Sequence, residues 1–335
     1  MKISLIVCTY MRPVALLQLL ESVKIQTLYP DEILIVDGST NAATEQALLE
    51  KHFPKLQYFL VPDAERGLTR QRNYGIARTA SNIDIICFLD DDTILETDYF
   101  QQLLCTYAAY PEALGVGGYI TNEVEWCKVT ADHRQSIGEF VYDGWLRKDG
   151  SRFVLRKKFG LDADVKPGFL PDFSHGRSIS FLPPSGKIYQ TEQLMGGVSS
   201  FPKRVFETFQ FSTYFEGYGL YEDADFTLRL SKTGPLYVNT AARLGHFHDS
   251  SGRPNKYRYG MMVVRNGWYI WRVKYPKPSF KARLKWHAVT LLLTGIRFSN
   301  TFTTAQKKEA FTEFSGRLVG WMSLLWNKPN ERITK

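Results

Sequence analysis

Three consecutive carboxylates, Asp90, Asp91 and Asp92, follow the short apolar run ICFL at residues 86–89. Like charges this close repel one another, so the group needs a nearby cation or a protonated member. A hard divalent ion, Mg²⁺ or Mn²⁺, is typically held by one or two carboxylates together with the phosphates of a substrate. We therefore expect a metal-assisted phosphate site at this position. The alternative is a solvated acidic turn.

Two other protein classes, one with paired aspartates and one with a glycine-rich loop, have motif positions that agree less well with this sequence. In haloacid-dehalogenase-type phosphatases the aspartate pair usually opens the first strand, whereas here the acids close the fourth expected strand and Thr93 comes one position too early. A dinucleotide-binding fold is disfavoured because no G-x-G-x-x-G follows the first strand.

Two further strand ends carry polar side chains. Thr9 and Tyr10 follow the first apolar run, and Asp37 follows the second, in ILIVDGST. The Asp37 carboxylate could accept a hydrogen bond from a base N–H or a ribose hydroxyl, as an acid does in dinucleotide folds. The alternative is an Asx-turn in which Gly38 supplies a positive φ angle.

Arg66 and Arg72 lie around the start of an expected helix at 67–79. An arginine near a helix N-terminus is a natural partner for an anionic ligand. A basic, exposed helix face would give the same pattern.

A second group of candidate residues lies near the end of the first 250 residues. Gly196 and Gly197 permit close backbone approach to a ligand, and Glu222, Asp223 and Asp225 begin a helix in YEDADFTLRL. Acids in a first helical turn are also simply stabilising. His246 precedes His248 by two residues in GHFHDS, and it is either a metal ligand or a structural histidine.

The elements that must position these residues alternate through the first 110 residues. Apolar runs predict strands at 2–9, 32–36, 56–61 and 83–89, and helical spacing predicts helices at 13–26, 42–52, 67–79 and 98–110. This alternation predicts an α/β fold with a mostly parallel central sheet covered by helices on both faces. Ligands of such sheets bind outside the carboxyl ends of the strands, where the polar groups above converge.

Composition is that of a globular protein with an uneven charge distribution. The 335 residues are 44% hydrophobic and carry a net charge of +8, and the four cysteines have no metal-site spacing. Residues 251–335 contain 17 Lys and Arg against 3 Asp and Glu, whereas residues 1–250 contain 25 against 31. We expect a catalytic domain over 1–250, with an irregular acceptor-side excursion at 119–190, and a basic, aromatic-rich helical extension over 251–335.

The order of the motifs resembles glycosyltransferase family 2, whose members have the A-type, Rossmann-like nucleotide-diphospho-sugar transferase fold. The segments that carry the resemblance are VCTYMRP at 7–13, VDGST at 36–40, QRNYG at 71–75, FLDDD at 88–92 and YEDAD at 221–225. They span about residues 1–250. The sequence departs from the family pattern at Met11, which stands in place of Asn, and at Tyr221, which stands in place of Gly.

The resemblance implies metal-dependent, inverting transfer of a sugar from a nucleotide-diphosphate donor to a hydroxyl acceptor. The residues expected to contact the nucleotide are Thr9, Tyr10, Asp37, Arg66, Arg72, Asp90 and Asp91. Those expected to bind Mn²⁺ or Mg²⁺ are Asp92, Asp90 and His246. Asp223 would deprotonate the acceptor, with Gly196, Gly197 and Glu222 on the acceptor side. The alternatives are a nucleotide-sugar-binding protein without turnover, and a phosphatase or nucleotidyltransferase on a similar sheet.

The basic extension contains two amphipathic stretches, 286–298 and 311–326, that are too short and too polar to span a bilayer. Tryptophan combined with Lys and Arg is typical of helices that lie at a membrane surface; the tryptophans concerned are Trp268, Trp271, Trp286, Trp321 and Trp326. We expect the extension to dock on an anionic membrane surface, so that the catalytic domain can reach a sugar or polyprenyl-linked acceptor. The expected location is cytoplasmic, peripheral at the inner face of the plasma membrane. Packing helices with a solvated basic face are the alternative, and no nucleic-acid partner is expected because no recognised motif accompanies the charge.

Overall fold

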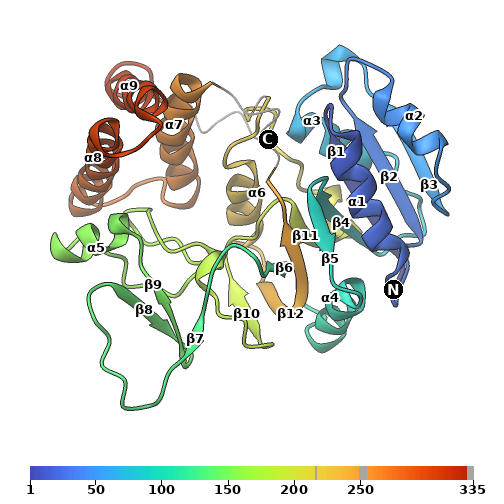
Figure 1. The fold of residues 1–335 in the computed structure, drawn as a ribbon, viewed down its shortest axis with the longest axis horizontal. Coiled ribbons are helices and arrows are strands. Elements are labelled where there is room, and N and C mark those ends of the chain that lie inside the picture. The colour runs from blue at the N-terminus through green and yellow to red at the C-terminus, as the bar shows by residue number, and fades with distance from the viewer. Residues whose placement is uncertain (216, 249–254, 330–335) are drawn as a thin grey trace. The chain divides into compact units, whose positions relative to one another are not determined.

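The computed structural model describes residues 1–215, 217–248 and 255–329, which fall into two compact units (Figure 1). Unit 1 comprises Met1–Val124 and Pro184–Arg253, and unit 2 comprises Glu125–Pro183 and Pro254–Lys335. This division cuts across the expected boundary at residue 250. Most of the irregular segment 119–190 belongs to unit 2, with the C-terminal helices, and not to unit 1.

The first half of the unit 1 sheet matches the sequence prediction closely. Its four strands are β1 (Ile3–Thr9), β2 (Glu32–Asp37), β3 (Leu56–Leu60) and β4 (Ile85–Asp90). They pair in parallel in the order β4-β1-β2-β3. The helices between and after them are α1 (Pro13–Lys24), α2 (Ala43–Leu49), α3 (Leu68–Ile76) and α4 (Tyr99–Ala109). The predicted α/β class is therefore confirmed.

The second half of the sheet is mixed, whereas a mostly parallel sheet was expected. Its strands are β5 (Thr93–Leu95), β6 (Gly115–Ile120), β10 (Ile188–Thr191), β11 (Val198–Pro202) and β12 (Leu236–His246). β11 lies antiparallel between β4 and β6, while β12 runs parallel to β6. A helix, α6 (Glu222–Leu230), precedes β12, and short 3₁₀ turns occupy Asp63–Glu65 and Lys203–Glu207.

Both faces of the sheet are covered, because alternate residues of each buried strand point to opposite sides. Leu5 and Val7 of β1 belong to one core cluster with Leu19 of α1. Ile6 faces the other side, where a Cβ added to Gly75 of α3 would come within 2.8 Å of it. Helix α3 therefore rests directly on β1, which places its N-terminal turn beside the carboxyl ends of the strands.

Unit 2 contains a small antiparallel sheet and four helices among its described residues. The strands are β7 (Cys127–Lys128), β8 (Glu139–Tyr142) and β9 (Trp145–Lys148), and the helices are α5 (Ser151–Lys158), α7 (Lys256–Lys274), α8 (Phe280–Thr303) and α9 (Lys307–Ser323). A 3₁₀ turn spans Ile179–Phe181.

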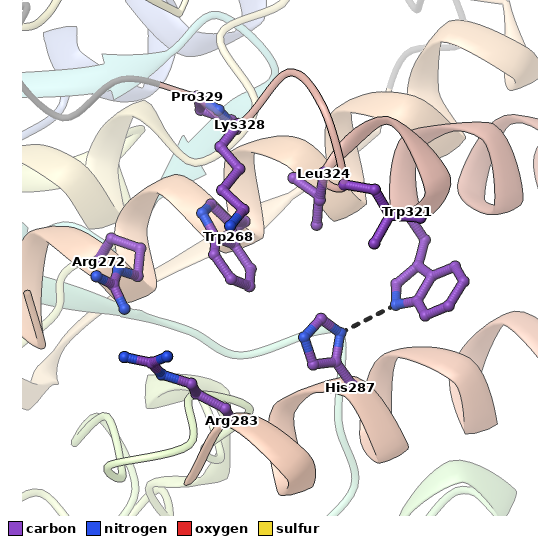
Figure 2. A pocket seen from close by; sticks show the side chains of 9 residues that line it. Trp268, Arg272, Arg283, His287, Trp321, Leu324, Lys328 and Pro329 are labelled. Carbon is purple, nitrogen blue, oxygen red and sulfur yellow. Dashed lines mark hydrogen bonds between the residues drawn. The ribbon is translucent and has the colours of Figure 1, made fainter. Parts of the chain in front are cut away.

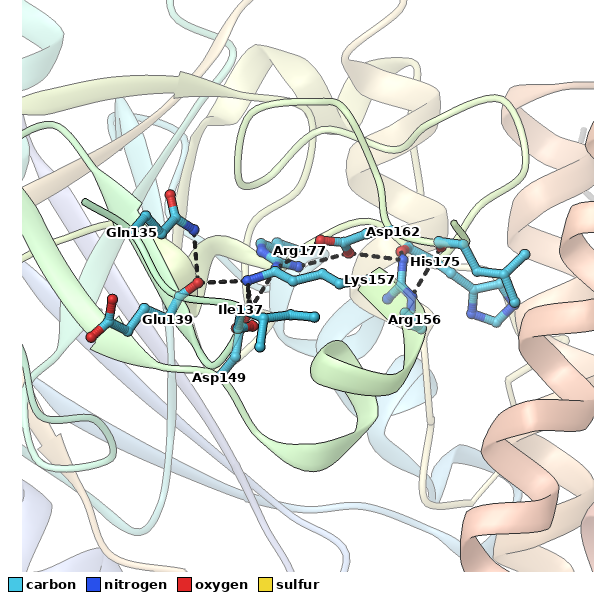
Figure 3. Close-up of polar contacts among 10 residues, drawn as sticks. Gln135, Ile137, Glu139, Asp149, Arg156, Lys157, Asp162, His175 and Arg177 are labelled. Atoms are coloured by element: carbon cyan, nitrogen blue, oxygen red, sulfur yellow. Dashed lines mark hydrogen bonds and ion pairs between the residues drawn. The ribbon is translucent and has the colours of Figure 1, made fainter. Parts of the chain in front are cut away.

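A buried ionic network ties together the irregular part of unit 2 (Figure 3). The Asp149 carboxylate, which has no exposed side-chain area, lies 2.7 Å from Lys157 Nζ and 2.9 Å from Arg177 Nη2. Arg177 also pairs with Asp162 at 3.0 Å. Sequence periodicity gives no signal for such a network, which explains why this segment reads as an irregular loop.

The expected membrane role of the tryptophans is wrong for most of them. Trp271 and Trp286 are 0% and 1% exposed and stack with ring centroids 5.4 Å apart. Trp268 is also buried, and the partly buried Trp321 packs against the same cluster. These four side chains form the core between α7, α8 and α9, and only Trp326 is largely exposed, at 70%. Within the described part of the chain, no helix combines the length and the apolarity that a membrane crossing requires.

Candidate active site

The three consecutive aspartates at the end of β4 have different sets of partners, and two of them share Arg12. Asp91 is buried, accepts a 2.7 Å hydrogen bond from Thr9 Oγ1 and lies 3.1 Å from Arg12 Nη1. Asp92 lies 3.1 Å from His246 Nε2 and 3.5 Å from Arg12 Nη1. Asp90 is more exposed and lies 3.9 Å from Arg72 Nη2. Arginine and histidine side chains thus offset the repulsion among the carboxylates.

The electrostatics of the cluster follow from burial and these contacts. Burial raises the pKa of Asp91 to about 6, although the Thr9 hydrogen bond and Arg12 act in the opposite direction. Burial lowers the pKa of His246, but its hydrogen bonds to Asp92 and Glu123 outweigh this and raise the pKa to about 10. His246 is therefore the imidazolium at neutral pH when no metal competes for its nitrogen.

Three side chains near the end of β4 could hold a metal ion, namely Asp92, His246 and His248. The donor atoms of Asp92, His246 and His248 all lie within 4.8 Å of one another. One carboxylate and two imidazoles are ligands that Mn²⁺ and other first-row divalent ions accept, and a three-ligand site leaves positions open for phosphate oxygens. Glu123 contacts His246 Nδ1 at 3.1 Å, so it would orient the imidazole as a carboxylate beside a metal-bound histidine does. The residues therefore fit a divalent ion.

The metal set differs in part from the expected one. Asp92 and His246 are brought together as expected, but Asp90 is not in this group, whereas His248 is. His248 lies 3.0 Å from the same Glu123 oxygen. The H-x-H spacing on an extended segment, which puts both rings on one side, is the signal in the sequence that could have identified it.

Groups of the protein itself hold the Asp37 carboxylate, and its contact with a nucleotide stays a prediction. Asp37 is fully buried, and its carboxylate accepts hydrogen bonds from the Ser39 N–H at 2.8 Å and the Tyr58 hydroxyl at 2.9 Å. The first is an Asx-turn. Gly38 does not have the positive φ expected of it. A Cβ at Gly38 would instead lie 3.0 Å from Gln71 Oε1.

Gln71 is a positioning residue that sequence reasoning missed. Its side-chain amide donates to the main-chain carbonyls of Thr9, at 3.1 Å, and Val36, at 2.8 Å. These bonds attach α3 to the ends of β1 and β2. A glutamine in a helix carries no signal by itself, because the partners are created by the parallel pairing of the two strands.

Arg72 is an internal cation more than a surface group. It is 2% exposed, lies 2.6 Å from Glu222 and sits over the rings of Phe88 and Phe211. Burial would lower its pKa, but Glu222 and Asp90 reverse this and raise it. Burial raises the pKa of Glu222 to about 8 in spite of Arg72. The pair joins α3 to α6 below the surface.

The glycine pair lies between the two groups of acids. A Cβ added to Gly197 would fall 2.0 Å from the Asp90 carboxylate carbon, and one added to Gly196 would fall 2.5 Å from Glu222 Oε1. The Gly196 N–H donates to Asp223 Oδ2 at 3.1 Å. The two glycines therefore do permit a close approach to the backbone, but the groups that approach it in this structure are carboxylates of the protein and not a ligand.

Asp223 is half-buried at the start of α6, and both its oxygens are held. Oδ1 accepts from the Ala224 N–H at 2.7 Å, and Oδ2 accepts from Gly196. Burial raises its pKa, while these two N–H groups act in the opposite direction. A fixed carboxylate with a raised pKa is suited to accept a proton from a hydroxyl.

Two loops of the site contain strained residues, and they are the two positions that depart from the family pattern. Met11 has φ 59° and Tyr221 has φ 72°, in the left-handed region. The pattern has Asn and Gly there, the residues that adopt this region most readily. The chain keeps the loop conformation in spite of the less suitable side chains.

Two further residues that were expected to contact the nucleotide, Tyr10 and Arg66, are not part of the contacts described above. Tyr10 is 45% exposed. Arg66 pairs with Asp63 at 2.5 Å and donates to the Ser39 carbonyl at 3.4 Å. Their contact with a nucleotide stays a prediction. Arg12 is the main cation that the sequence prediction omitted, although it stands within the quoted VCTYMRP segment.

Comparison with known proteins agrees with the fold and the motifs. Residues 4–168 match the model of glycosyl transferase family 2, which confirms the resemblance that the motifs indicate. The uncharacterized glycosyltransferase YwdF of Bacillus subtilis is 29% identical over 57% of this chain and 58% of its own. The glucosyl-dolichyl phosphate glucuronosyltransferase of Haloferax volcanii is 31% identical over 36% of this chain and 38% of its own.

A solved structure shares the fold at low sequence identity. GalNAc-T7, crystallised with UDP, GalNAc and Mn²⁺, superposes with a TM-score of 0.51 at 14% identity, over 87% of this chain and 57% of that chain. The alignments thus cover less than two thirds of the length of each of these proteins.

The Glu222–Arg72 pair predicts a pH dependence of stability. The pKa of Glu222 is about 8 in the folded protein against an ordinary 4.5, so between these values the folded state holds a proton that the unfolded state releases. The free energy of unfolding should therefore fall with rising pH, by at most about 1.4 kcal/mol per unit from this group.

Glu222→Gln should remove that part of the slope, measured by urea unfolding at several pH values between 5 and 8. Glu50→Gln, at an exposed acid of unit 1, is the control and should keep the wild-type slope. Parallel profiles for all three proteins would contradict the raised pKa.

Proposed function

We propose that the protein transfers a sugar from a nucleotide-diphosphate donor to a hydroxyl acceptor, with a divalent metal and inversion at the anomeric carbon. The match of residues 4–168 to the family model supports the reaction class. The donor set of Asp92, His246 and His248 supports the metal. A single candidate base supports inversion, since one displacement needs no carboxylate nucleophile.

The observation that carries the proposal is the double contact made by the glycine pair. Gly197 lies against the Asp90 carboxylate and Gly196 donates to Asp223. The end of β4, where phosphate-binding groups gather, and the start of α6, where the base stands, are thereby held next to each other. Transfer between two bound substrates requires this proximity of the leaving group and the attacking hydroxyl.

Among the acids of α6, Asp223 is the one available for catalysis. Glu222 is committed to Arg72 at 2.6 Å, and Asp225 is fully buried with Arg229 at 2.8 Å. In the part of the chain that the structure describes, Asp223 accepts hydrogen bonds from two backbone N–H groups, and it keeps some exposure. The base assignment therefore falls on Asp223.

The leaving group carries negative charge as the bond to the sugar breaks. A divalent ion at Asp92 and the histidines would neutralise that charge on the departing diphosphate. Arg12, between Asp91 and Asp92, keeps these two carboxylates in place, and Thr9 fixes the orientation of Asp91.

Asp223→Asn should reduce transfer from a labelled nucleotide sugar by about 100-fold or more, the usual size of a general-base contribution. Donor binding should change little, since the amide keeps the size of the side chain. Asp92→Ala should instead weaken donor binding in the presence of Mn²⁺. Glu207→Gln, at an exposed acid of unit 1, is the control. Undiminished transfer by Asp223→Asn would mean that the base is another group, and release of inorganic phosphate would indicate a phosphatase.

We further propose that the acceptor is linked to a lipid and that α8 contacts the membrane. The name of the Haloferax relative states that it acts on a dolichyl phosphate-linked sugar. On α8 an exposed apolar stripe repeats at intervals of three or four residues; its members are Phe280, Leu284, Ala288, Leu291, Gly295, Phe298 and Phe302. The opposite side of the helix, with Trp286 and Val289, is buried.

Charge identifies an anionic bilayer as the surface that fits the stripe. Helix α8 contains no acidic residue and four basic ones, at 281, 283, 285 and 297. At the C-terminal end of α8 the apolar surface extends to α9, because Phe298 of α8 and Phe314 of α9 have ring centroids 4.9 Å apart. An apolar stripe flanked by cations is the pattern of a helix that lies in the membrane interface.

Liposome co-sedimentation tests this surface. Binding should require anionic lipid and decrease as salt screens the charges. Leu284→Ser with Leu291→Ser should reduce partitioning at least about tenfold, since each exposed leucine contributes of order 1 kcal/mol or more when buried in lipid. The matched control is Ile25→Ser with Leu49→Ser, at exposed apolar positions of unit 1. Equal loss in both double variants, or equal binding to neutral vesicles, would contradict the proposal.

A further inference from the structure

Unit 2 contains a pocket of about 430 Å³ that none of the motifs above explains (Figure 2). It is formed by the C-terminal part of α7, the N-terminal part of α8 and the segment that ends α9. Its volume lies at the lower end of the range of small-molecule sites. All of its lining residues belong to unit 2.

Three cations line this pocket, and no acid is among the described residues that do so. The cations are Arg272, Arg283 and Lys328. Figure 2 shows the guanidinium groups of Arg272 and Arg283 directed towards each other. Arg272 also donates to the Pro276 carbonyl, so Arg283 and Lys328 are the cations that a bound anion would stabilise most, for the same reason that the aspartates of unit 1 need cations.

His287 adds a hydrogen-bond donor to the same space. Trp321 Nε1–H donates to its Nδ1 at 3.1 Å, so the neutral imidazole carries its proton on Nε2. Burial and then Lys328 lower the pKa of His287, which favours this neutral form. In Figure 2 the nitrogen that does not bond Trp321 faces the open side of the ring, towards the arginines.

Apolar groups complete the pocket. Lys328 Nζ lies over the Trp268 ring at 5.9 Å from its centroid. Leu324 is buried, whereas Leu325, which also lines the pocket, is 71% exposed. The pocket therefore combines cations and an N–H with an indole and leucines.

We propose that this pocket binds a phosphate or diphosphate group whose other end is apolar. Arginine forks match phosphate oxygens in geometry, and Lys328 supplies a further positive charge. The phosphate could belong to a lipid headgroup or to a free phosphate ester. The inference does not depend on the transfer reaction, because no residue of the pocket takes part in the proposed chemistry.

Calorimetric titration of the full chain tests the pocket, with geranyl diphosphate and inorganic pyrophosphate as probes. EDTA is present throughout, so that no metal assists diphosphate binding at the aspartates. We expect one saturable site per chain. Arg283→Gln and Lys328→Gln should each weaken binding about tenfold or more, the size expected for a charge-assisted hydrogen bond.

Lys281→Gln is the matched control, because it removes the same charge from the same exposed part of α8 but does not line the pocket. It should change the affinity less than about twofold. Tighter binding of geranyl diphosphate than of pyrophosphate identifies a lipid-type ligand, and equal affinities identify a free phosphate. Absence of saturable binding, or an equal loss in Arg283→Gln and Lys281→Gln, would overturn the proposal. Thermal unfolding of each variant confirms that it remains folded.

Discussion

The repulsion among Asp90, Asp91 and Asp92 is the constraint on which the site depends. The carboxylates are satisfied by several parts of unit 1: Asp91 by Thr9, Asp92 by His246, and Asp90 by the distant charge of Arg72, while Arg12 is shared by Asp91 and Asp92. These contacts join β1, β12 and α3 to the end of β4. The Arg72–Glu222 pair then extends the connection to α6, which carries Asp223. A cluster that would be unstable in isolation thus organises the elements around it.

The sequence was sufficient for the elements whose signal is local. Strands β1, β2 and β4 are buried and consist largely of apolar residues, and helix α1 between the first two has clear periodicity. β11 was missed, because a short strand that enters antiparallel between β4 and β6 is defined by its partners. The residues missed in the site, Gln71 and Glu123 among them, have the same character: their roles arise from contacts between segments far apart in the chain.

Unit 2 shows where composition misleads. Tryptophans among lysines and arginines are typical of a membrane interface, yet Trp271 and Trp286 stack inside the helical core. The exposed stripe of α8 consists mainly of Phe and Leu. Their spacing can be recognised in the sequence when the full length of the helix is considered. The predicted stretch 286–298 was shorter than α8, Phe280–Thr303, and it therefore omitted the ends of the stripe. The positive charge of the extension likewise has two structural contexts, the flanks of α8 and the pocket around Arg283.

The central claim is that the end of β4 holds a metal-bound nucleoside diphosphate. Thermal unfolding of the full chain with UDP, GDP, dTDP or CMP, each with and without Mn²⁺, tests it most directly. A ligand at about 100 times its dissociation constant stabilises the folded state by about 2.7 kcal/mol. At least one nucleotide should therefore raise the Tm by a few degrees with Mn²⁺ present, and Asp92→Ala should abolish the rise. If no nucleotide stabilises the protein, or if the rise is the same without metal and in Asp92→Ala, the claim is contradicted.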